Sequence, residues 1–128
     1  MRARDIMTKE LAWVRGDNTA LEASDTMRSR DISSVLVEPR DSDDTWGILT
    51  LSDVVKRVVE TGRDPRTVQV HEIMSKPLVL IDPSLSVTYC AQLMERTDVR
   101  RLPVFDGEGI VGIVSHRDIV RSLIHAGP

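Results

Sequence analysis

The nine residues GIVSHRDIV, residues 112–120, repeat the pattern of an earlier stretch, GILTLSDVV, residues 47–55. Both run glycine, two aliphatic residues, a hydroxyl residue, two variable positions, aspartate and two aliphatic residues. An aliphatic run that ends in Ser or Thr, with Asp three positions later, is typical of a strand that leads into a capped helix. The chain therefore carries the same predicted strand-to-helix junction twice.

The repetition extends along most of the chain. DIMT at residues 5–8 returns as EIMS at residues 72–75, and the same shift of 67 positions carries Met27 to Met94 and Val37 to Val104. By Gly47 the shift to Gly112 has fallen to 65, so the second copy is two residues shorter in the turn-rich segment before this glycine. Length differences of this kind belong in loops. An internal repeat of this length predicts one fold unit written twice.

Each copy has the same predicted order of elements, β-α-β-β-α. The strands are expected at residues 11–14, 34–37 and 46–50, and again at residues 78–81, 102–105 and 110–115. We expect an α/β (α+β) fold in which the two repeats pack with pseudo-twofold symmetry, because one copy of roughly 55 residues is marginal alone. The predicted domains are residues 1–62 and 70–128, joined by a linker at residues 63–69.

Four helices are predicted from apolar residues at one-face spacing. The first helix of each copy buries Ala20, Ala23 and Met27, or Val87, Cys90, Ala91 and Met94. The closing helices carry aliphatic stripes, at Val54, Val55, Val58 and Val59 and at Ile119, Val120, Leu123 and Ile124. These residues are mediocre helix formers, so the stripes must pack, either inside the chain or against a second copy.

Composition excludes several function classes. A formal charge of −3 is unlike a nucleic-acid binder, and no apolar run approaches the roughly 20 residues that cross a bilayer. One cysteine and a charged N-terminal stretch favour a cytoplasmic protein that contacts neither nucleic acid nor membrane. Cys90 lies on an apolar helix face, and no metal-ligand spacing appears. The sequence therefore predicts neither an enzyme nor a metal site.

The pattern resembles a tandem pair of cystathionine-β-synthase (CBS) domains, often called a Bateman module. The motifs that carry the resemblance are DIMT, EIMS, RRLPVFD at residues 100–106, and the two glycine-to-aspartate phrases. The first copy departs from the family pattern at one point, because Leu36 stands where the second copy has Pro103. We therefore expect the backbone of the two copies to differ at this strand.

The resemblance implies a regulatory function without catalysis. Such modules bind an adenosyl ligand, here AMP, ADP, ATP, NAD or S-adenosylmethionine, in clefts between the two repeats, and no cofactor is required. The resemblance also implies homodimers and a ligand-dependent change in packing that signals to a protein partner. The alternative is a ligand-free module that serves only for docking or dimerisation.

The resemblance places the ligand ribose at the hydroxyl–x–x–Asp motifs, Ser115 with Asp118 and Thr50 with Asp53. A carboxylate can accept hydrogen bonds from two neighbouring ribose hydroxyls. The same residues also form a helix-capping box, and the local sequence alone favours that simpler role.

The two clefts are predicted to differ in how they bind phosphate. By the resemblance, Arg100 and Arg101 contact phosphate, with His116 and Arg117 adding positive charge, and Ile32 and Ser33 form an adenine wall in that cleft. In the first copy, Ser33 and Ser34 replace the two arginines, so the opposite cleft, with Thr50, Asp53 and Val99, is expected to be empty or to take an uncharged adenosyl group. A solvated strand edge is the alternative for the arginine pair.

Overall fold

The computed structural model describes residues 1–125 and divides the chain into two compact units. Unit 1 contains Met1–Leu11 and Val79–Pro128, and unit 2 contains Ala12–Leu78. Each unit is therefore built mainly from one sequence repeat together with a short segment from the other. The predicted domain boundaries were drawn from the sequence repeat, whereas these two units are defined by which residues contact each other. The predicted boundaries therefore stay a prediction.

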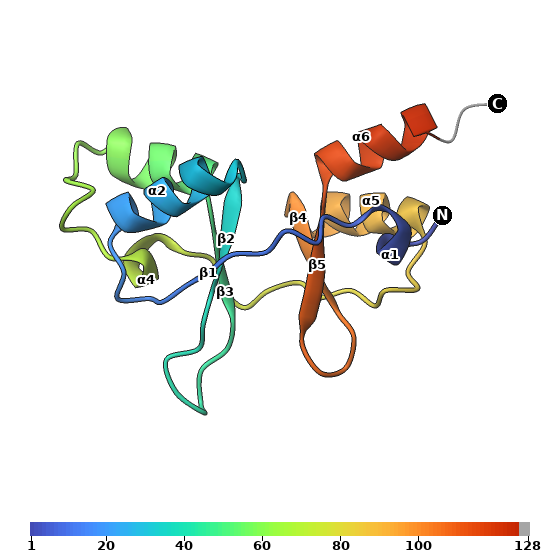
Figure 1. Ribbon diagram of the computed structural model, residues 1–128, viewed down its shortest axis with the longest axis horizontal. Coiled ribbons are helices and arrows are strands. Elements are labelled where there is room, and N and C mark those ends of the chain that lie inside the picture. Colours follow the sequence, from blue (N-terminus) through green and yellow to red (C-terminus); the bar gives the residue numbers. More distant parts are fainter. Residues whose placement is uncertain (126–128) are drawn as a thin grey trace. The chain divides into compact units, whose positions relative to one another are not determined.

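Unit 2 is a three-stranded sheet with helices on one side (Figure 1). Strand β2 (Ser34–Val37) lies between β1 (Trp13–Val14), to which it is parallel, and β3 (Gly47–Thr50), to which it is antiparallel. The helices are α2 (Ala20–Arg30), α3 (Leu51–Val54) with its π-helical continuation η1 (Val55–Val59), and α4 (Val70–Ile73). Helix α2 starts at the predicted capping box of Thr19 and Glu22 and buries Ala20, Ala23 and Met27.

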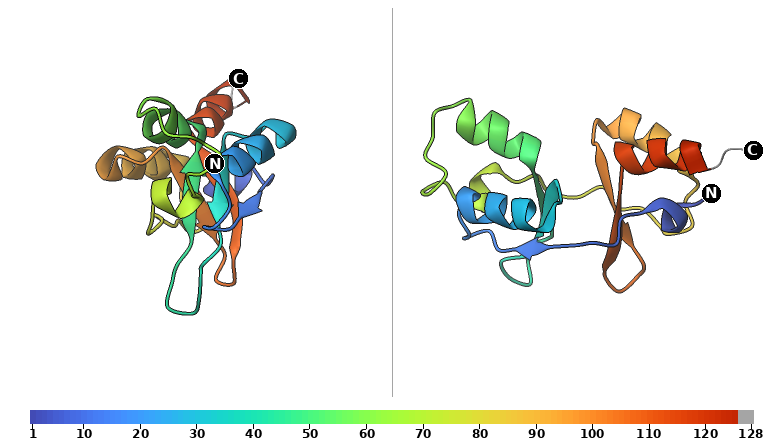
Figure 2. Two further views of the ribbon diagram at one scale, coloured as in Figure 1. Left: turned by 90° about the vertical axis from the view of Figure 1, so that its left-hand side faces the viewer. Right: turned by 45° about the horizontal axis from the view of Figure 1, so that its top comes forward.

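Unit 1 repeats this plan with a smaller sheet (Figure 2). Strands β4 (Arg101–Phe105) and β5 (Ile110–Ser115) form an antiparallel hairpin, with Gly107 at positive φ in the turn. Its helices are α1 (Ala3–Ile6), α5 (Val87–Thr97) and α6 (His116–His125). The predicted α+β fold of two repeats is confirmed, and so are the predicted hairpins.

The strand predicted at residues 78–81 is wrong, because only Ile81 pairs with β4. In the first repeat, the N–H of Leu36 donates to the carbonyl of Ala12 over 2.9 Å. The equivalent residues in the second repeat are Pro103 and Val79, and proline has no N–H to donate. The departure at Leu36 thus lengthens the first sheet, and the proline shortens the second.

The lead segments, residues 5–8 and 72–75, each complete the sheet of the unit that holds the other repeat. Thr8 exchanges two backbone hydrogen bonds with Ile113 of β5, at 2.9 and 3.0 Å. Ser75 makes the same pair of bonds with Ile48 of β3, at 2.9 and 3.0 Å. Each lead segment adds a short antiparallel bridge to the strand that contains the repeated glycine.

The glycine of each phrase provides room for the methionine of the lead segment. A Cβ atom at Gly112 would lie 2.5 Å from the Sδ atom of Met7, which is too close for a non-bonded contact. At Gly47 the equivalent distance, to the Sδ atom of Met74, is 2.9 Å. The two glycines therefore stand where a lead segment lies directly on the strand.

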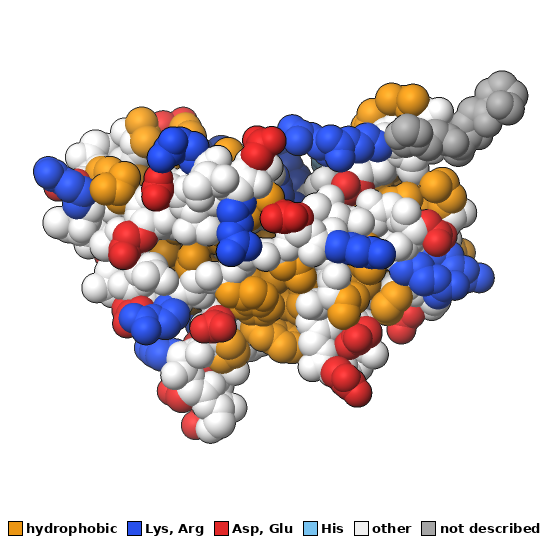
Figure 3. All heavy atoms as spheres, viewed as in Figure 1, with side chains coloured by type: hydrophobic (Ala, Val, Ile, Leu, Met, Phe, Trp, Pro, Cys, Tyr) orange, Lys and Arg blue, Asp and Glu red, His pale blue; other side chains and the backbone are white. Residues whose placement is uncertain are grey.

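The closing stripes are buried only in part, so packing within the chain accounts for some of their residues and not for others. In η1, Val58 is fully buried, but Val59 is exposed; in α6, Leu123 and Ile124 are 70% and 72% exposed. Hydrophobic side chains are visible on the surface over α6 in Figure 3. Ala91 was predicted to be buried but is exposed. The buried residues of α5 are Cys90 and Met94.

None of the helices within residues 1–125 combines the length and the apolar character that crossing a bilayer requires.

Replacing Gly112 with alanine should destabilise the chain, because the new methyl group overlaps Met7. Overpacking of this kind costs roughly 1–3 kcal/mol, measured as the free energy of urea unfolding. Gly109→Ala is the matched control, because a Cβ at Gly109 meets nothing within 4 Å. Equal stability of the two variants would show that Met7 does not pack on Gly112 as described.

Candidate functional site

The junction between β5 and α6 brings Ser115 and Asp118 into direct contact. The carboxylate Oδ2 of Asp118 accepts hydrogen bonds from the Ser115 N–H at 2.8 Å and from the Ser115 hydroxyl at 3.0 Å. The Asp118 N–H in turn donates to the Ser115 Oγ over 3.3 Å. These contacts form a reciprocal cap of α6, so the capping interpretation of this motif is confirmed.

The second carboxylate oxygen of Asp118 is also occupied. The hydroxyl of Thr8, in the lead segment, donates to Oδ1 over 2.9 Å. Asp118 is only 5% exposed, and both of its oxygens accept hydrogen bonds from within unit 1. A ribose hydroxyl would have to compete with Thr8 or use the one remaining lone pair of Oδ1.

The junction between β3 and α3 has the same cap and a more available carboxylate. The Thr50 N–H donates to Oδ2 of Asp53 over 2.9 Å, and the Asp53 N–H donates to the Thr50 Oγ1 over 3.1 Å. Within residues 1–125, the other oxygen of Asp53 has no hydrogen-bond partner, and the residue is half-buried. The hydroxyl of Ser75, the counterpart of Thr8, makes no such bond to Asp53. The two carboxylates therefore differ in what they can still accept.

The structure brings several predicted phosphate contacts together at the end of the β4–β5 hairpin. Arg101 lies opposite Ser115 in the β-sheet register, and Arg100 directly precedes β4. His116 and Arg117 are exposed in the first turn of α6. Three arginines and a histidine therefore lie at, or next in sequence to, the strand and helix ends that form the Ser115–Asp118 junction.

The predicted adenine-wall residues are divided between the units. Ile32 and Ser33 lie in unit 2, where Ser33 accepts a hydrogen bond from the Leu51 N–H at 3.0 Å and Ile32 packs on the core. Val99 lies in unit 1 and packs on that unit's core. The proposed combination of Ile32 and Ser33 with the arginines crosses the two units and stays a prediction.

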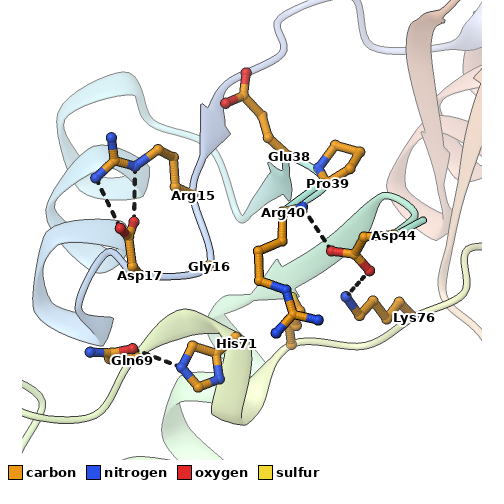
Figure 4. Close-up of a pocket in the computed structure, with 11 residues that line it drawn as sticks. Arg15, Gly16, Asp17, Glu38, Pro39, Arg40, Asp44, Gln69, His71 and Lys76 are labelled. Atoms are coloured by element: carbon orange, nitrogen blue, oxygen red, sulfur yellow. Dashed lines mark hydrogen bonds and ion pairs between the residues drawn. The ribbon is translucent and has the colours of Figure 1, made fainter. Parts of the chain in front are cut away.

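Two features of the site were missed by reasoning from the sequence. The bond from Thr8 to Asp118 joins residues 110 positions apart, although the matched hydroxyl residues of DIMT and EIMS were a signal for it. The second feature is a cavity of about 620 Å³ in unit 2 (Figure 4). It lies where β1 and β2 end, away from the Thr50–Asp53 junction at the end of β3.

The described residues offer little for catalysis or metal binding. Cys90 is buried, and this burial raises the pKa of its thiol, which disfavours the nucleophilic thiolate. Across residues 1–125, no three His, Cys, Asp or Glu side chains are placed to hold a metal ion.

Comparison with known proteins identifies the repeat. The pattern of the CBS domain family matches the chain twice, at residues 3–60 and 70–125. Hypoxic response protein 1 of Mycobacterium tuberculosis is 34% identical over 121 residues, which cover 94% of this chain and 84% of that protein. An uncharacterised protein of Methanopyrus kandleri is 36% identical over 80% of this chain, and a mitochondrial CBS domain-containing protein of Arabidopsis thaliana is 29% identical over 88%. The chain spans only 53% and 56% of the lengths of these last two relatives.

Solved structures give the same answer. A hexameric CBS-CP12 protein from bloom-forming cyanobacteria has a TM-score of 0.89 at 40% identity, over 94% of this chain and 69% of that one. A putative signal-transduction protein with CBS domains from Burkholderia ambifaria has a TM-score of 0.83 at 32% identity, over 94% and 87%. The chain belongs to the CBS domain family and carries two CBS domains in tandem.

Proposed function

We propose that this tandem CBS pair is a non-catalytic regulatory module that binds an adenosyl ligand through its two hydroxyl–x–x–Asp junctions. The candidate ligands are AMP, ADP, ATP, NAD and S-adenosylmethionine. The observation that carries the proposal is the pair of strand-to-helix junctions, each of which holds a carboxylate beside a hydroxyl. Capping and ribose binding are compatible, because a carboxylate has about four lone-pair sites and the cap uses only part of them.

Asp53 is the better acceptor for a ribose. Its unpartnered oxygen and half-buried position let it receive ribose hydroxyls without breaking an internal bond. Asp118 must share an oxygen with Thr8, so ribose binding there is weaker unless other contacts contribute. This difference supports ribose binding at the Thr50–Asp53 junction, where we propose an uncharged adenosyl group.

The Ser115–Asp118 junction is the better site for phosphate. Arg101 lies opposite Ser115 in the β-sheet register and Arg100 directly precedes it, whereas the equivalent positions of the first repeat are Ser33 and Ser34. A guanidinium binds phosphate by paired, charge-assisted hydrogen bonds that a serine hydroxyl cannot make. Arginine contacts to phosphate thus offset the poorer access to the Asp118 carboxylate.

A module of this kind transmits binding by shifting its own packing or its assembly. A ligand favours whichever arrangement it contacts better, and so changes the population of that arrangement. We propose that copies of the chain associate as homodimers through the exposed stripes of η1 and α6, where Val59, Leu123 and Ile124 are open to solvent. The hexameric state of the cyanobacterial CBS-CP12 protein supports assembly in this family.

A ligand-free docking module is the second candidate. It is favoured by the exposed α6 stripe and by the internal hydrogen bonds that already occupy both carboxylate oxygens of Asp118. The two candidates differ in one measurable property, the binding of adenosyl compounds.

Asp53→Asn should raise the dissociation constant about ten- to a hundredfold for the adenosyl compounds that bind at this junction. Isothermal titration calorimetry measures this change. The asparagine oxygen can still accept from the Thr50 N–H, so the helix cap is kept while the charge is lost. Asp118→Asn is a less clean test, because Thr8 and Ser115 both donate to that carboxylate and an amide NH₂ cannot accept.

Glu22→Gln is the matched control for Asp53→Asn. Thr19 and Glu22 form a capping box of the same geometry in the same unit, with contacts of 2.8 and 3.1 Å. Both variants should lose at most about 1 kcal/mol of unfolding free energy, but only Asp53→Asn should lose binding. Equal loss of binding in both variants would assign Asp53 to capping alone. If none of the five compounds binds the unmodified chain at millimolar concentration, the chain acts as a ligand-free docking module.

The double variant Arg100→Ala/Arg101→Ala should bind ATP and ADP at least roughly tenfold more weakly, while its binding of S-adenosylmethionine changes little. The matched control is Arg96→Ala/Arg121→Ala, which removes two exposed arginines from the same unit. Unchanged ATP and ADP affinity in the first variant, or an equal loss in both, would contradict the unequal sites.

A further inference from the structure

The cavity in unit 2 lies at the carboxyl ends of two parallel strands. Residues 15–17 follow β1, and residues 38–40 follow β2, so both loops leave the sheet at the same edge. The third wall comes from α4 and the residues after it, including His71 and Lys76. Crevices at the carboxyl ends of parallel strands are common ligand sites, and about 620 Å³ is within the size range of small-molecule pockets.

Hydrogen bonds hold the walls of this cavity in place. The N–H of His71 donates to the carbonyl of Gly16 over 2.9 Å, and a Cβ at Gly16 would lie 3.2 Å from the Cβ of His71. The His71 Nε2 is 2.7 Å from the Oε1 of Gln69, which fixes the ring. A side chain at residue 16 would therefore crowd α4, which lies close to the end of β1 here.

Most charged side chains that line the cavity are already paired. Arg15 and Asp17 form a two-point ion pair at 2.9 and 3.1 Å. Lys76 contacts Asp44 at 2.6 Å, and this hydrogen bond holds the pKa of the Asp44 carboxyl well below its usual range. Asp44 also accepts from the N–H of Arg40 at 2.8 Å, which anchors the loop that carries Arg40.

Arg40 is different from its neighbours. Within the part of the chain that the structure describes, its guanidinium has neither a hydrogen-bond partner nor an ion-pair partner. In Figure 4 the guanidinium extends toward the imidazole of His71 and the ammonium of Lys76, so groups able to carry positive charge gather on one side of the cavity. The carboxylate of Glu38, which has no partner among residues 1–125, extends in another direction, where it can accept from a hydroxyl or an amino group.

We propose that this cavity is a second ligand site, which binds a small metabolite through a phosphate or carboxylate group held by Arg40, His71 and Lys76. The site belongs to unit 2 alone, because Arg40 lies in the loop that is two residues longer than its counterpart in the second repeat. Residue 82, the counterpart of Arg15, is an aspartate, and residue 84, the counterpart of Asp17, is a serine. The proposal does not depend on the adenosyl sites. Thr50 and Asp53 lie at the opposite end of this sheet, and Ser115 and Asp118 lie in unit 1.

The test uses the full chain labelled with ¹⁵N, titrated with inorganic phosphate and, separately, with acetate at constant ionic strength. We expect saturable amide shifts at Gly16, Arg40 and His71 with at least one of the two anions. Saturation by phosphate alone identifies a phosphate-bearing ligand class, and saturation by acetate alone identifies a carboxylate class. Shifts that rise linearly with both salts, without saturation, would overturn the proposal.

Arg40→Gln should weaken the saturable binding at least roughly tenfold, because a charge-assisted contact to the anion is lost. Arg40 is exposed, so the variant should fold as the unmodified chain does. Arg28→Gln removes one exposed arginine from the same unit and should leave the titration unchanged. Equal affinity in Arg40→Gln and the unmodified chain would remove Arg40 from the site and overturn the proposal. The arginine pair at residues 100 and 101 provides a further control, because its loss should affect ATP and not these shifts.

Discussion

The contact between each lead segment and the strand of the other repeat is the constraint on which the rest of the structure depends. Met7 lies against Gly112, and Thr8 exchanges two backbone hydrogen bonds with Ile113. The other lead segment makes the same contacts with β3. A strand edge without this bridge would leave N–H and C=O groups unpaired and the glycine face uncovered. Neither repeat therefore completes a compact unit from its own residues.

This exchange also sets the chemistry of the two junctions. Thr8 reaches Asp118 because the lead segment lies on β5, whereas Ser75 in the same position leaves one oxygen of Asp53 unpartnered. The two carboxylates are otherwise similar, and they differ in that only Asp118 accepts a hydrogen bond from a lead-segment hydroxyl. Together with Arg101, which lies opposite Ser115 in the β-sheet register, this difference makes the two junctions chemically unequal.

Reasoning from the sequence predicted most of the fold, because the repeat, the helical spacing and the capping residues are local signals. Thr19 with Glu22, and Thr50 with Asp53, cap helices where the spacing placed them. Residues 78–81 do not by themselves reveal that they form only a single bridge, since their pairing with β4 depends on whether residue 103 has an N–H. The site was predictable only in its junction residues. The Thr8–Asp118 bond and the cavity around Arg40 arise from loops and segments that meet only in the folded chain.

The most direct test of the exchange between repeats is the stability of the two halves, residues 1–62 and 70–128, prepared separately and then mixed. Residues 70–128 lack the lead segment that covers Gly112, and they also lack Ala3 of α1, which is fully buried in the core of unit 1. The account predicts that neither half unfolds cooperatively in urea, and that an equimolar mixture recovers a cooperative transition. A cooperative transition in either half alone, at the urea midpoint of the intact chain, would contradict it.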